Sequence, residues 1–566
     1  MLNKRRYVVL ALILLIFSLT LATFSAKLYL PNDLSHSFPG WRSKPAEPIA
    51  TSSPEVIESV TALPLEYYTE TDVDGVCSRF SPAYFEDFRA HTASYCSAES
   101  PAKLTCFHRS SGFDGKTDSF CYAQGAVLDV QRGKFHLNCE LRQFSEQEID
   151  NGLLPFDRLP AYWYDTGPHN IFSAAIDVSA STDAPTSNNA ESGHEEEKID
   201  PHSTYHPVEA EPTPSIPPPK TLLLLKREGE GNPWHCLMEI FSTFMAFDIL
   251  RMPGGESGDQ PPFFRDPIDS EHTQAIILDD RDDGPYFDLW TLFARRKPSR
   301  LADLLSDRDA TESLTSVNLI IPLAGSSNPF WKDDGDAGQC ANSPNLNVFS
   351  RRVLDFYGAQ YPLPRPQEQP IIVTFVWRQR RRLKNENYLF AELGRRNRHI
   401  KVRMIDFAAL PFTEQVRVAQ ESDVLVGVHG AGLTHSMFMR QGAGAVVEII
   451  PEGFEHRGFR NIAGMRNLGY FRTHAKIIPS GSWVAGDVGD AVDIMQAVKR
   501  TSDEIRRDDS QDESHGITEV REGDKLERRD DWHVKDIEIE EHRFFEAVET
   551  AIKFMYTKGP WSLDVN

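Results

Sequence analysis

The sequence predicts an α/β protein with two Rossmann-like domains, and three observations support this fold class. Residues 370–451 alternate short β-branched runs with helical segments, which is the pattern of parallel strands joined by crossover helices. One of these strands runs directly into a glycine-rich turn, HGAG at 429–432. A separate strand and helix, at 221–227 and 234–250, precede this region. The chain has 566 residues and 40% hydrophobic content, which is enough for the cores of several domains.

The C-terminal half is predicted in most detail. Apolar runs at 370–377, 400–405, 424–428 and 445–450 are expected to be strands, with one helix at 387–396 and another that begins at 413 between them. Glu448 lies inside the last apolar run, where a carboxylate needs a partner. Two roles are open for it. It can hold the ribose hydroxyls of a nucleotide near a strand end, or it can pair with another buried group.

The glycine turn is the feature around which this half is organised. Gly430 and Gly432 remove side chains where the backbone approaches something closely, and a helix is expected to begin at Leu433. The first N–H groups of such a helix are free to bind an anion, and a diphosphate would fit there. The alternative is a tight turn whose glycines serve only packing.

A burst of cations follows the strand at 370–377 and runs from Arg378 to Lys384. The carboxyl ends of parallel strands are where doubly wound sheets bind their ligands. Guanidinium groups suit phosphate because they bind its oxygens in bidentate fashion and stay charged. An exposed basic loop without a ligand is the alternative.

The helix at 234–250 carries the candidate residues of the first half. His235 and Glu239 lie one turn apart at its start. Alternatively, His235 only hydrogen-bonds nearby backbone. After the next predicted strand, Asp280 and Asp282 have the Asp-x-Asp spacing of a divalent-cation site, but the run of acids before Gly284 favours an exposed turn.

Two segments of the C-terminal half resemble a known family. HGAGLTH at 429–435 followed by VVEIIP at 446–451 resembles the donor-site signature of glycosyltransferase family 61. The preceding VRMIDFAALPF at 402–412 is similar to the EGF-domain-specific O-linked N-acetylglucosamine transferases of that family. The resemblance is strong over 370–470 and looser back to 222. It implies a GT-B-like architecture, in which two Rossmann-like domains face a cleft.

The resemblance also implies roles for individual residues. His235 looks like the end of an Asn-x-x-His element on the acceptor side, where it would act as general base or orient the acceptor hydroxyl, and Glu239 is the rival base. An arginine just after the strand at 370–377 would bind the diphosphate, which favours Arg378 over Arg382. The residues expected to bind the donor are Arg378, Arg382, Asn385, Asp406, His429, Gly430, Ala431, Gly432, Leu433, Thr434 and Glu448.

The reaction implied by the resemblance is an inverting transfer of N-acetylglucosamine from UDP-N-acetylglucosamine to a Ser or Thr hydroxyl of a protein. The implied partners are the UDP-sugar and a lumenal protein or glycan acceptor. No cofactor beyond the UDP-sugar is required, and a divalent metal is not expected. Two alternatives remain: transfer of xylose or arabinose to glycans, and a non-catalytic, membrane-anchored carbohydrate-binding protein. The formal net charge of −23 argues against a nucleic-acid-binding protein.

The N-terminus predicts the compartment. Three cations at 4–6 precede an apolar run at 7–24, which is expected to be a transmembrane anchor with its N-terminus in the cytosol. A cleaved signal peptide is the alternative. Either delivers the rest of the chain to the secretory pathway, and the anchor favours a type II protein of the Golgi or endoplasmic reticulum membrane.

The predicted order of domains follows from these features. The chain has seven cysteines, five of them between 77 and 139, so disulfides are expected in the lumen, with at least one thiol left free. The expected segments are a tail and anchor at 1–30, a stem at 31–70, a Cys-rich N-terminal subdomain at 71–174, a disordered insertion at 175–220, an acceptor-side domain at 221–365, a donor-binding domain at 366–500, a charged disordered insertion at 501–540 and a C-terminal helix at 541–566.

Overall fold

The computed structural model describes most of the chain after residue 62. The described residues are 63–67, 77–110, 117–180, 219–254, 261–359, 369–479, 535–557 and 562–565, without 309, 310, 312, 313, 315, 333 and 336. Among these residues, no helix is both long enough and apolar enough to cross a membrane. The predicted anchor at 7–24 and most of the predicted stem lie outside the described residues.

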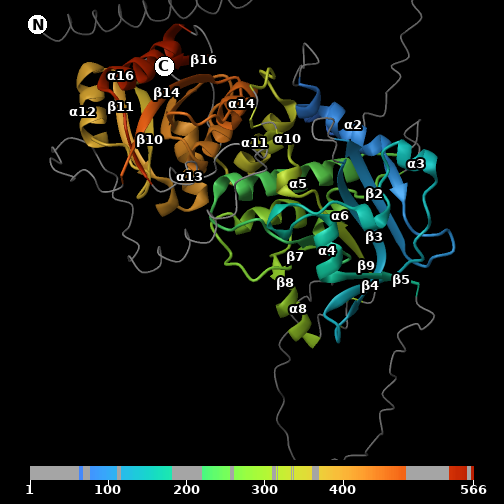
Figure 1. The fold of residues 1–566 in the computed structure, drawn as a ribbon. Helices are drawn as coiled ribbons and strands as arrows, with labels where there is room; N and C mark the ends of the chain where they lie inside the picture. Colours follow the sequence, from blue (N-terminus) through green and yellow to red (C-terminus); the bar gives the residue numbers. More distant parts are fainter. Residues whose placement is uncertain are drawn as a thin grey trace, which may run out of the picture. The chain divides into compact units, whose positions relative to one another are not determined.

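The first sheet has nine strands within the described residues, in the order β1-β2-β3-β9-β6-β7-β8, with β4 and β5 attached through β3 (Figure 1). The strands β6, β7, β8 and β9 run parallel, as a Rossmann-like half requires. The bounds are β1 Thr92–Ser94, β2 Lys103–Ser110, β3 Thr117–Asp129, β4 Lys134–Asn138, β5 Ile176–Ser179, β6 Thr221–Leu225, β7 Thr273–Ile277, β8 Ser299–Arg300 and β9 Val317–Ile321.

Two predicted segment boundaries differ from this sheet. The segment 71–174, expected to be an N-terminal subdomain that caps the catalytic body, is continuous with the first sheet, because β3 pairs antiparallel with β9. Its strands have apolar residues that continue the same core, which is why they join that sheet. The predicted insertion at 175–220 begins with β5, which pairs with β4, and residues 181–218 lie outside the described part.

The second sheet has seven strands within the described residues, in the order β11-β10-β12-β13-β14-β15, and β16 pairs with β14. All are parallel except β15, which is antiparallel to β14. The bounds are β10 Ile371–Trp377, β11 Ile400–Asp406, β12 Val424–Val428, β13 Ala445–Pro451, β14 Gly469–Ile478, β15 Asp536–Glu538 and β16 Ser562–Val565.

The predicted α/β class and the predicted strands of this half are confirmed. In Figure 1 its strands are coloured orange to red and those of the first sheet blue to green. The strand β15 falls inside the predicted charged insertion, where its apolar residue Ile537 is buried in the core of the second sheet. The predicted boundary at 365/366 lies outside the described residues.

The described α-helices have these bounds: α2 Pro82–Ala90, α3 Glu146–Asp150, α4 Pro168–Ala175, α5 Pro233–Arg251, α6 Ile268–Glu271, α7 Thr291–Ala294, α8 Leu301–Ser306, α10 Pro329–Lys332, α11 Pro344–Phe356, α12 Glu386–Arg396, α13 Phe412–Glu421, α14 Gly458–Met465 and α16 Glu541–Thr557. The predicted C-terminal helix is therefore present as α16, followed by β16.

Helix α5 is buried on nearly all of its faces. Its start is well defined, because Asn232 caps it by accepting from the Trp234 N–H at 3.0 Å and Pro233 occupies the first turn. One cluster of buried apolar side chains extends from β6 through α5 and α11 to β10, β12 and β13. Within it, Phe241 of α5 stacks on Phe349 of α11 with ring centroids 4.4 Å apart. The two sheets therefore share a core with α5 in it.

Three disulfides connect six of the cysteines: Cys77–Cys340, Cys96–Cys139 and Cys106–Cys121. The remaining cysteine, Cys236, is buried and forms no disulfide, as the odd number of cysteines predicted for at least one thiol. Disulfides of this kind are typical of proteins folded in an oxidising compartment, in agreement with the predicted secretory pathway.

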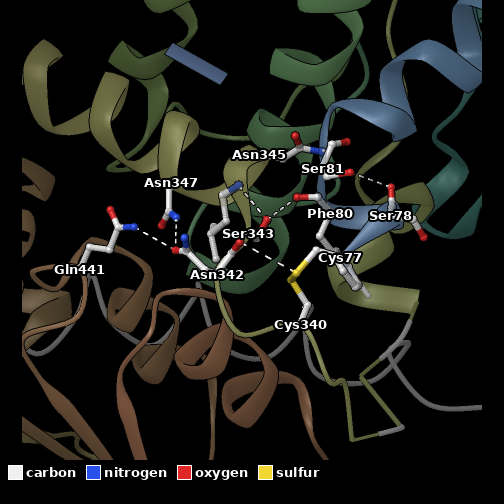
Figure 2. The surroundings of a disulfide bond; sticks show 11 residues. Cys77, Ser78, Phe80, Ser81, Cys340, Asn342, Ser343, Asn345, Asn347 and Gln441 are labelled. Atoms are coloured by element: carbon white, nitrogen blue, oxygen red, sulfur yellow. Dashed lines mark hydrogen bonds between the residues drawn. A yellow bond between two sulfur atoms is a disulfide. The ribbon is translucent and has the colours of Figure 1, made fainter. Parts of the chain in front are cut away.

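The Cys77–Cys340 bond lies among hydrogen bonds that connect three distant segments (Figure 2). The Ser343 hydroxyl donates to Phe80 O at 2.6 Å, and the amide of Gln441 donates to Asn342 Oδ1 at 3.0 Å. The segment that contains Cys340 is thereby attached both to residues 77–81 and to the loop after η8 (Ala431–Phe438) in the second half.

This pairing makes a testable prediction about thiol reactivity. The native chain should not react with iodoacetamide at Cys236, because that thiol is buried. The unfolded, unreduced chain should react at one thiol only, and peptide mapping should place the label on Cys236. Reduction should expose all seven thiols. Labelling of any other cysteine before reduction would contradict the pairing.

Candidate active site

The carboxyl ends of the parallel strands in the first sheet carry buried charged side chains. Arg227 follows β6 and Asp279 follows β7, and Arg227 Nη2 lies 2.7 Å from Asp279 Oδ1. The same guanidinium donates to the backbone oxygens of Arg281 and Asp282, each at 2.8 Å. Arg227 therefore holds the segment of Asp280 and Asp282, which supports assigning the Asp-x-Asp spacing to a turn.

Glu228 is completely buried and was missed by the sequence analysis. Its Oε1 accepts from the Ser326 N–H at 2.8 Å and from the Thr166 hydroxyl at 3.4 Å. A Cβ at Gly325 would lie only 2.8 Å from Oε1, so the glycine makes room for the carboxylate. Glu228 Oε2 has no hydrogen-bond partner among the described residues. The signal that could have found Glu228 is an acid just beyond a buried parallel strand.

The start of α5 places His235 beside Glu228. His235 Nδ1 lies 3.8 Å from Glu228 Oε2. Nδ1 is buried whereas the side chain as a whole is 14% exposed, so the exposed atoms are elsewhere on this side chain. The rings of Tyr164 and Trp331 contact the imidazole edge-on, with centroids 5.0 and 4.6 Å away. Tyr164 is held at a φ of 58°, an uncommon backbone conformation for a tyrosine.

Glu239, the other predicted candidate base, has a different environment. Its Oε2 accepts from the Glu228 N–H at 3.1 Å. Burial, and then the neighbouring Glu228 carboxylate, raise the pKa of Glu239 well above its usual value. This shift favours the protonated form of Glu239, which is the form that cannot take a proton from an acceptor. The geometry favours His235 over Glu239 as the base.

In the second half, the glycine turn after β12 leads into η8, a 3-10 helix over Ala431–Phe438. The expected helix is present, but it begins at Ala431 and not at Leu433. The Leu433 N–H donates to Gly430 O at 2.9 Å, which is the tighter 3-10 pattern. Ala431 and Gly432 are half-buried, whereas Leu433 and Thr434 are buried. The accessible backbone of this turn is thus at Ala431 and Gly432.

The two glycines of the turn have different neighbours. A Cβ at Gly432 would lie 2.7 Å from Val376 Cγ1, so this glycine serves close packing. A Cβ at Gly430 would lie 2.6 Å from Arg378 Nη1, and the φ of Gly430 is 145°. The Arg378 guanidinium donates to the backbone oxygen of His429 at 3.2 Å and to that of the last residue of β12. The predicted association of Arg378 with the glycine turn is therefore present.

Three other predicted donor-binding residues have structural roles. Arg382 forms an ion pair with the buried Glu386, four residues away. Asn385 adopts a left-handed conformation, with φ 58°, at the start of α12. Asp406 accepts from the Ala408 N–H at 3.1 Å and caps the short helix η7 (Phe407–Ala409), and burial raises its pKa. Arg382 and Asp406 thus have partners within the chain, and Asn385 provides the turn into α12.

Glu448 is fully buried and its two oxygens have partners within the chain. Oε1 lies 2.5 Å from His429 Nδ1, and Oε2 accepts from the Tyr470 hydroxyl at 2.5 Å. Burial acts to raise the pKa of Glu448, but these hydrogen bonds outweigh it and the pKa is lowered. Burial lowers the pKa of His429 to about 4. A neutral imidazole thus donates to an ionised carboxylate, and of the two predicted roles the buried pairing is favoured over ribose binding.

Aromatic rings connect the two halves of the site. The His456 ring lies 4.7 Å from that of His429 in the second half and 6.0 Å from that of Trp234 at the start of α5. Phe459 contacts the same two rings at 5.4 and 5.3 Å. Because Trp234 directly precedes His235, the glycine turn and the acceptor-side histidine belong to one region. The 3-10 helix η8 also packs against α5.

Arginines that the sequence analysis left without a role gather beside Tyr470. Burial lowers the pKa of Arg460, Tyr470 opposes this shift, and the positive charges of Arg457 and Arg472 lower the pKa further. Glu455 forms ion pairs with Arg457 at 2.7 Å and with Arg472 at 3.7 Å. Such a group of guanidiniums at the strand ends suits an anionic ligand.

Residues 234–446 match the family model of Glycosyltransferase 61. The predicted resemblance is confirmed over this region, which includes His235, Arg378 and the glycine turn. Glu228 and Glu448 lie just outside the family 61 region.

Several curated proteins are similar to part of the chain. The EGF domain-specific O-linked N-acetylglucosamine transferase of Drosophila melanogaster is 30% identical over 161 residues, which cover 28% of this chain and 29% of the relative. The proteins of the same name from Gallus gallus and Bos taurus are 30% and 28% identical over 146 and 144 residues, or 25% of this chain and 26% and 27% of the relatives. The chain thus matches less than a third of the length of these relatives.

The buried pair of Glu448 and Tyr470 provides a stability test. Tyr470→Phe removes the donor to an ionised carboxylate and should lower the free energy of unfolding by about 1–3 kcal/mol at pH 7. The pKa of folded Glu448 is lowered, so its ionised form stabilises the fold above the unfolded pKa of about 4.3, and this stabilisation is lost as the pH falls through the folded pKa. The difference between variant and wild type should therefore shrink below pH 4 in urea unfolding.

A double-mutant cycle with Glu448→Gln supplies the control. In that background the carboxylate charge is absent, and Tyr470→Phe should cost less than in the wild type. An equal cost in both backgrounds, or a cost that does not change with pH, would contradict the assignment of an ionised Glu448.

Proposed function

We propose that this chain is an inverting glycosyltransferase that transfers N-acetylglucosamine from UDP-N-acetylglucosamine to a Ser or Thr hydroxyl of a lumenal protein. The observation that carries the proposal is the Arg378 guanidinium held against Gly430 at the start of η8, in the same region as His235. The match of residues 234–446 to family 61 supports the transferase class. The names of the similar curated proteins support the choice of sugar and acceptor.

The donor would bind at the carboxyl ends of the second sheet. Its diphosphate would lie against the half-buried backbone of Ala431 and Gly432, where the first N–H groups of a helix point outward. Arg378 and the guanidiniums near Tyr470 would neutralise the phosphates. Since cations of the protein supply this charge, the proposed reaction needs no cofactor beyond the UDP-sugar.

The acceptor would approach from the first sheet. His235 would take the proton of the acceptor hydroxyl while its oxygen attacks the anomeric carbon, and the bond from that carbon to the diphosphate breaks in the same step. Arg378 would stabilise the negative charge on the departing UDP. A single displacement inverts the anomeric centre without a covalent enzyme intermediate.

The proposal includes architecture and location. The two parallel sheets, joined by the core around α5, fit a GT-B-like arrangement with the donor on the second half and the acceptor on the first. The three disulfides favour the lumen of the secretory pathway. A membrane anchor at 7–24 would hold the enzyme as a type II protein of the Golgi or endoplasmic reticulum.

Release of UDP from UDP-sugars, with a peptide acceptor present, tests this function directly. Arg378→Ala should reduce kcat/KM by at least about 100-fold, because it removes a charge that stabilises the leaving diphosphate. Arg378→Lys should restore only part of the activity, since an ammonium cannot reproduce the guanidinium fork. Thermal stabilisation by UDP should be lost in parallel.

Arg382→Ala is the matched control. Arg382 lies four residues further along the same basic segment, but its guanidinium is engaged by Glu386. This variant should lose stability and still be stabilised by UDP. Equal loss of UDP binding in both variants would contradict the assignment of Arg378, and the absence of turnover with every UDP-sugar in the wild type would contradict the transferase proposal.

A further inference from the structure

We propose that Glu228 is a positioning residue whose carboxylate accepts a hydrogen bond from His235 Nδ1–H and thereby leaves His235 Nε2 as the proton acceptor. The catalytic consequence rests on the proposed function, whereas the arrangement of the two side chains does not. The sequence alone did not predict that Glu228 and His235 lie side by side. Glu228 also lies outside the region that matches the family model.

The first argument is that two unsatisfied polar atoms face one another. Glu228 Oε2 and His235 Nδ1 are both buried, and neither has a hydrogen-bond partner among the described residues. They lie 3.8 Å apart, about 1 Å more than a charge-assisted hydrogen bond. Catalytic hydrogen bonds are often long without substrate and tighten when it binds. A small rotation of the His235 ring would bring the two atoms within hydrogen-bond distance.

The second argument is that the rest of the carboxylate is fixed. Two donors, the Ser326 N–H and the Thr166 hydroxyl, share Oε1. Gly325 lies beside this carboxylate, where an added Cβ would come within 2.8 Å of Oε1. Oε2 is therefore the oxygen that faces His235. An ionised carboxylate in this position selects the imidazole tautomer that carries its proton on Nδ1.

The third argument concerns the other ring nitrogen. His235 Nε2 makes no hydrogen bond to any residue that the structure describes, and the exposed part of the side chain excludes Nδ1. In the reaction, the acceptor O–H proton moves to Nε2, the acceptor oxygen bonds to the anomeric carbon, and the electron pair of the broken bond leaves with UDP. The imidazolium formed in this step is balanced by the Glu228 carboxylate.

Glu239 fits this arrangement as a neutral neighbour. It accepts from the Glu228 N–H, and burial beside Glu228 raises its pKa well above the usual value. The shift favours the neutral form of Glu239, which lies beside the carboxylate that faces His235.

The decisive variant is Glu228→Gln in the full chain. The amide oxygen should turn toward the Ser326 and Thr166 donors, so that the amide N–H group faces His235 Nδ1 and forces the proton onto Nε2. We expect kcat to fall by about 10²- to 10⁴-fold, while KM for the UDP-sugar stays within about threefold. If the substitution only disturbed packing, the amount of folded enzyme would fall, but the folded enzyme would keep its kcat.

Two control variants test whether the expected loss of kcat comes from the position of Glu228 beside His235 or from the replacement of any buried acid. Asp248→Asn replaces another fully buried acid on α5, bound by Tyr67 and Arg352, and should lower thermal stability while keeping kcat within about threefold. Glu239→Gln keeps an oxygen for the Glu228 N–H and should retain kcat within about tenfold. A loss from Glu239→Gln as large as that from Glu228→Gln would overturn the proposal.

A readout that needs no turnover tests the same point. Nitrogen-15 spectra of histidine-labelled chain, with the His235 signals assigned by their loss in His235→Asn, should show the proton on Nδ1 in the wild type and on Nε2 in Glu228→Gln. A wild-type proton on Nε2, or an unchanged kcat in Glu228→Gln, would overturn the proposal even if the variant tautomer could not be measured. Absence of turnover in the wild type would instead overturn the proposed function. The nitrogen-15 spectra of His235 would then be the test of the role of Glu228.

Discussion

The burial of α5 is the constraint on which the rest of the structure depends. A helix whose side chains are covered on nearly every face can be accommodated only if both sheets contribute to its surroundings. Its position is further defined at the N-terminus, where the Asn232 cap fixes the first turn. Because Trp234 and His235 lie in that turn, packing of an apolar helix determines where a polar side chain meets the second half of the molecule.

Glycines have separate functions at the site, and the neighbours of each explain why. Gly432 lies against Val376, so its lack of a side chain allows β10 and η8 to pack closely. Gly430 lies against the Arg378 guanidinium, and Gly325 lies against the Glu228 carboxylate. The last two glycines thus make room for charged groups, one on each half, at the carboxyl ends of parallel strands.

The strands of the second half could be predicted because each is buried on both faces. Such a strand is a short, continuous run of apolar, β-branched residues, which is easily recognised in the sequence. The glycine turn was likewise apparent from local spacing, whereas Arg378 was singled out among its basic neighbours by the resemblance to family 61. The roles of Arg382 and Asp406 could not be predicted, because an arginine in a basic segment gives no sign of the acid that engages it. Glu228 was missed for a similar reason: its partners at 166 and 326 are far away in the sequence.

The sequence also could not predict that residues 71–174 join the first sheet. Cysteine clustering indicates a segment that is cross-linked by disulfides, but it does not show which strand the segment pairs with. The pairing of β3 with β9 connects residues about two hundred positions apart, and only the shared core reveals it. The clustering of cysteines therefore predicted disulfides, but it did not predict how the segment is arranged relative to the first sheet.

Two histidines of the site have a buried acid nearby, and their surroundings distinguish their functions. His429 already donates to Glu448, is enclosed by the rings of Phe454, His456 and Phe459, and has its pKa lowered to about 4 by burial. Its proton stabilises an ionised carboxylate in the core, which is a structural task.

His235 faces an acid that it does not yet contact, and its side chain is twice as exposed as that of His429, at 14% against 7%. A satisfied pair such as His429 and Glu448 gains stability from its hydrogen bond in the resting state. The bond between His235 and Glu228 is long at rest, and it strengthens when positive charge develops on the ring, which is the moment of proton transfer. A hydrogen bond that is stronger in the transition state than in the resting state can contribute to catalysis.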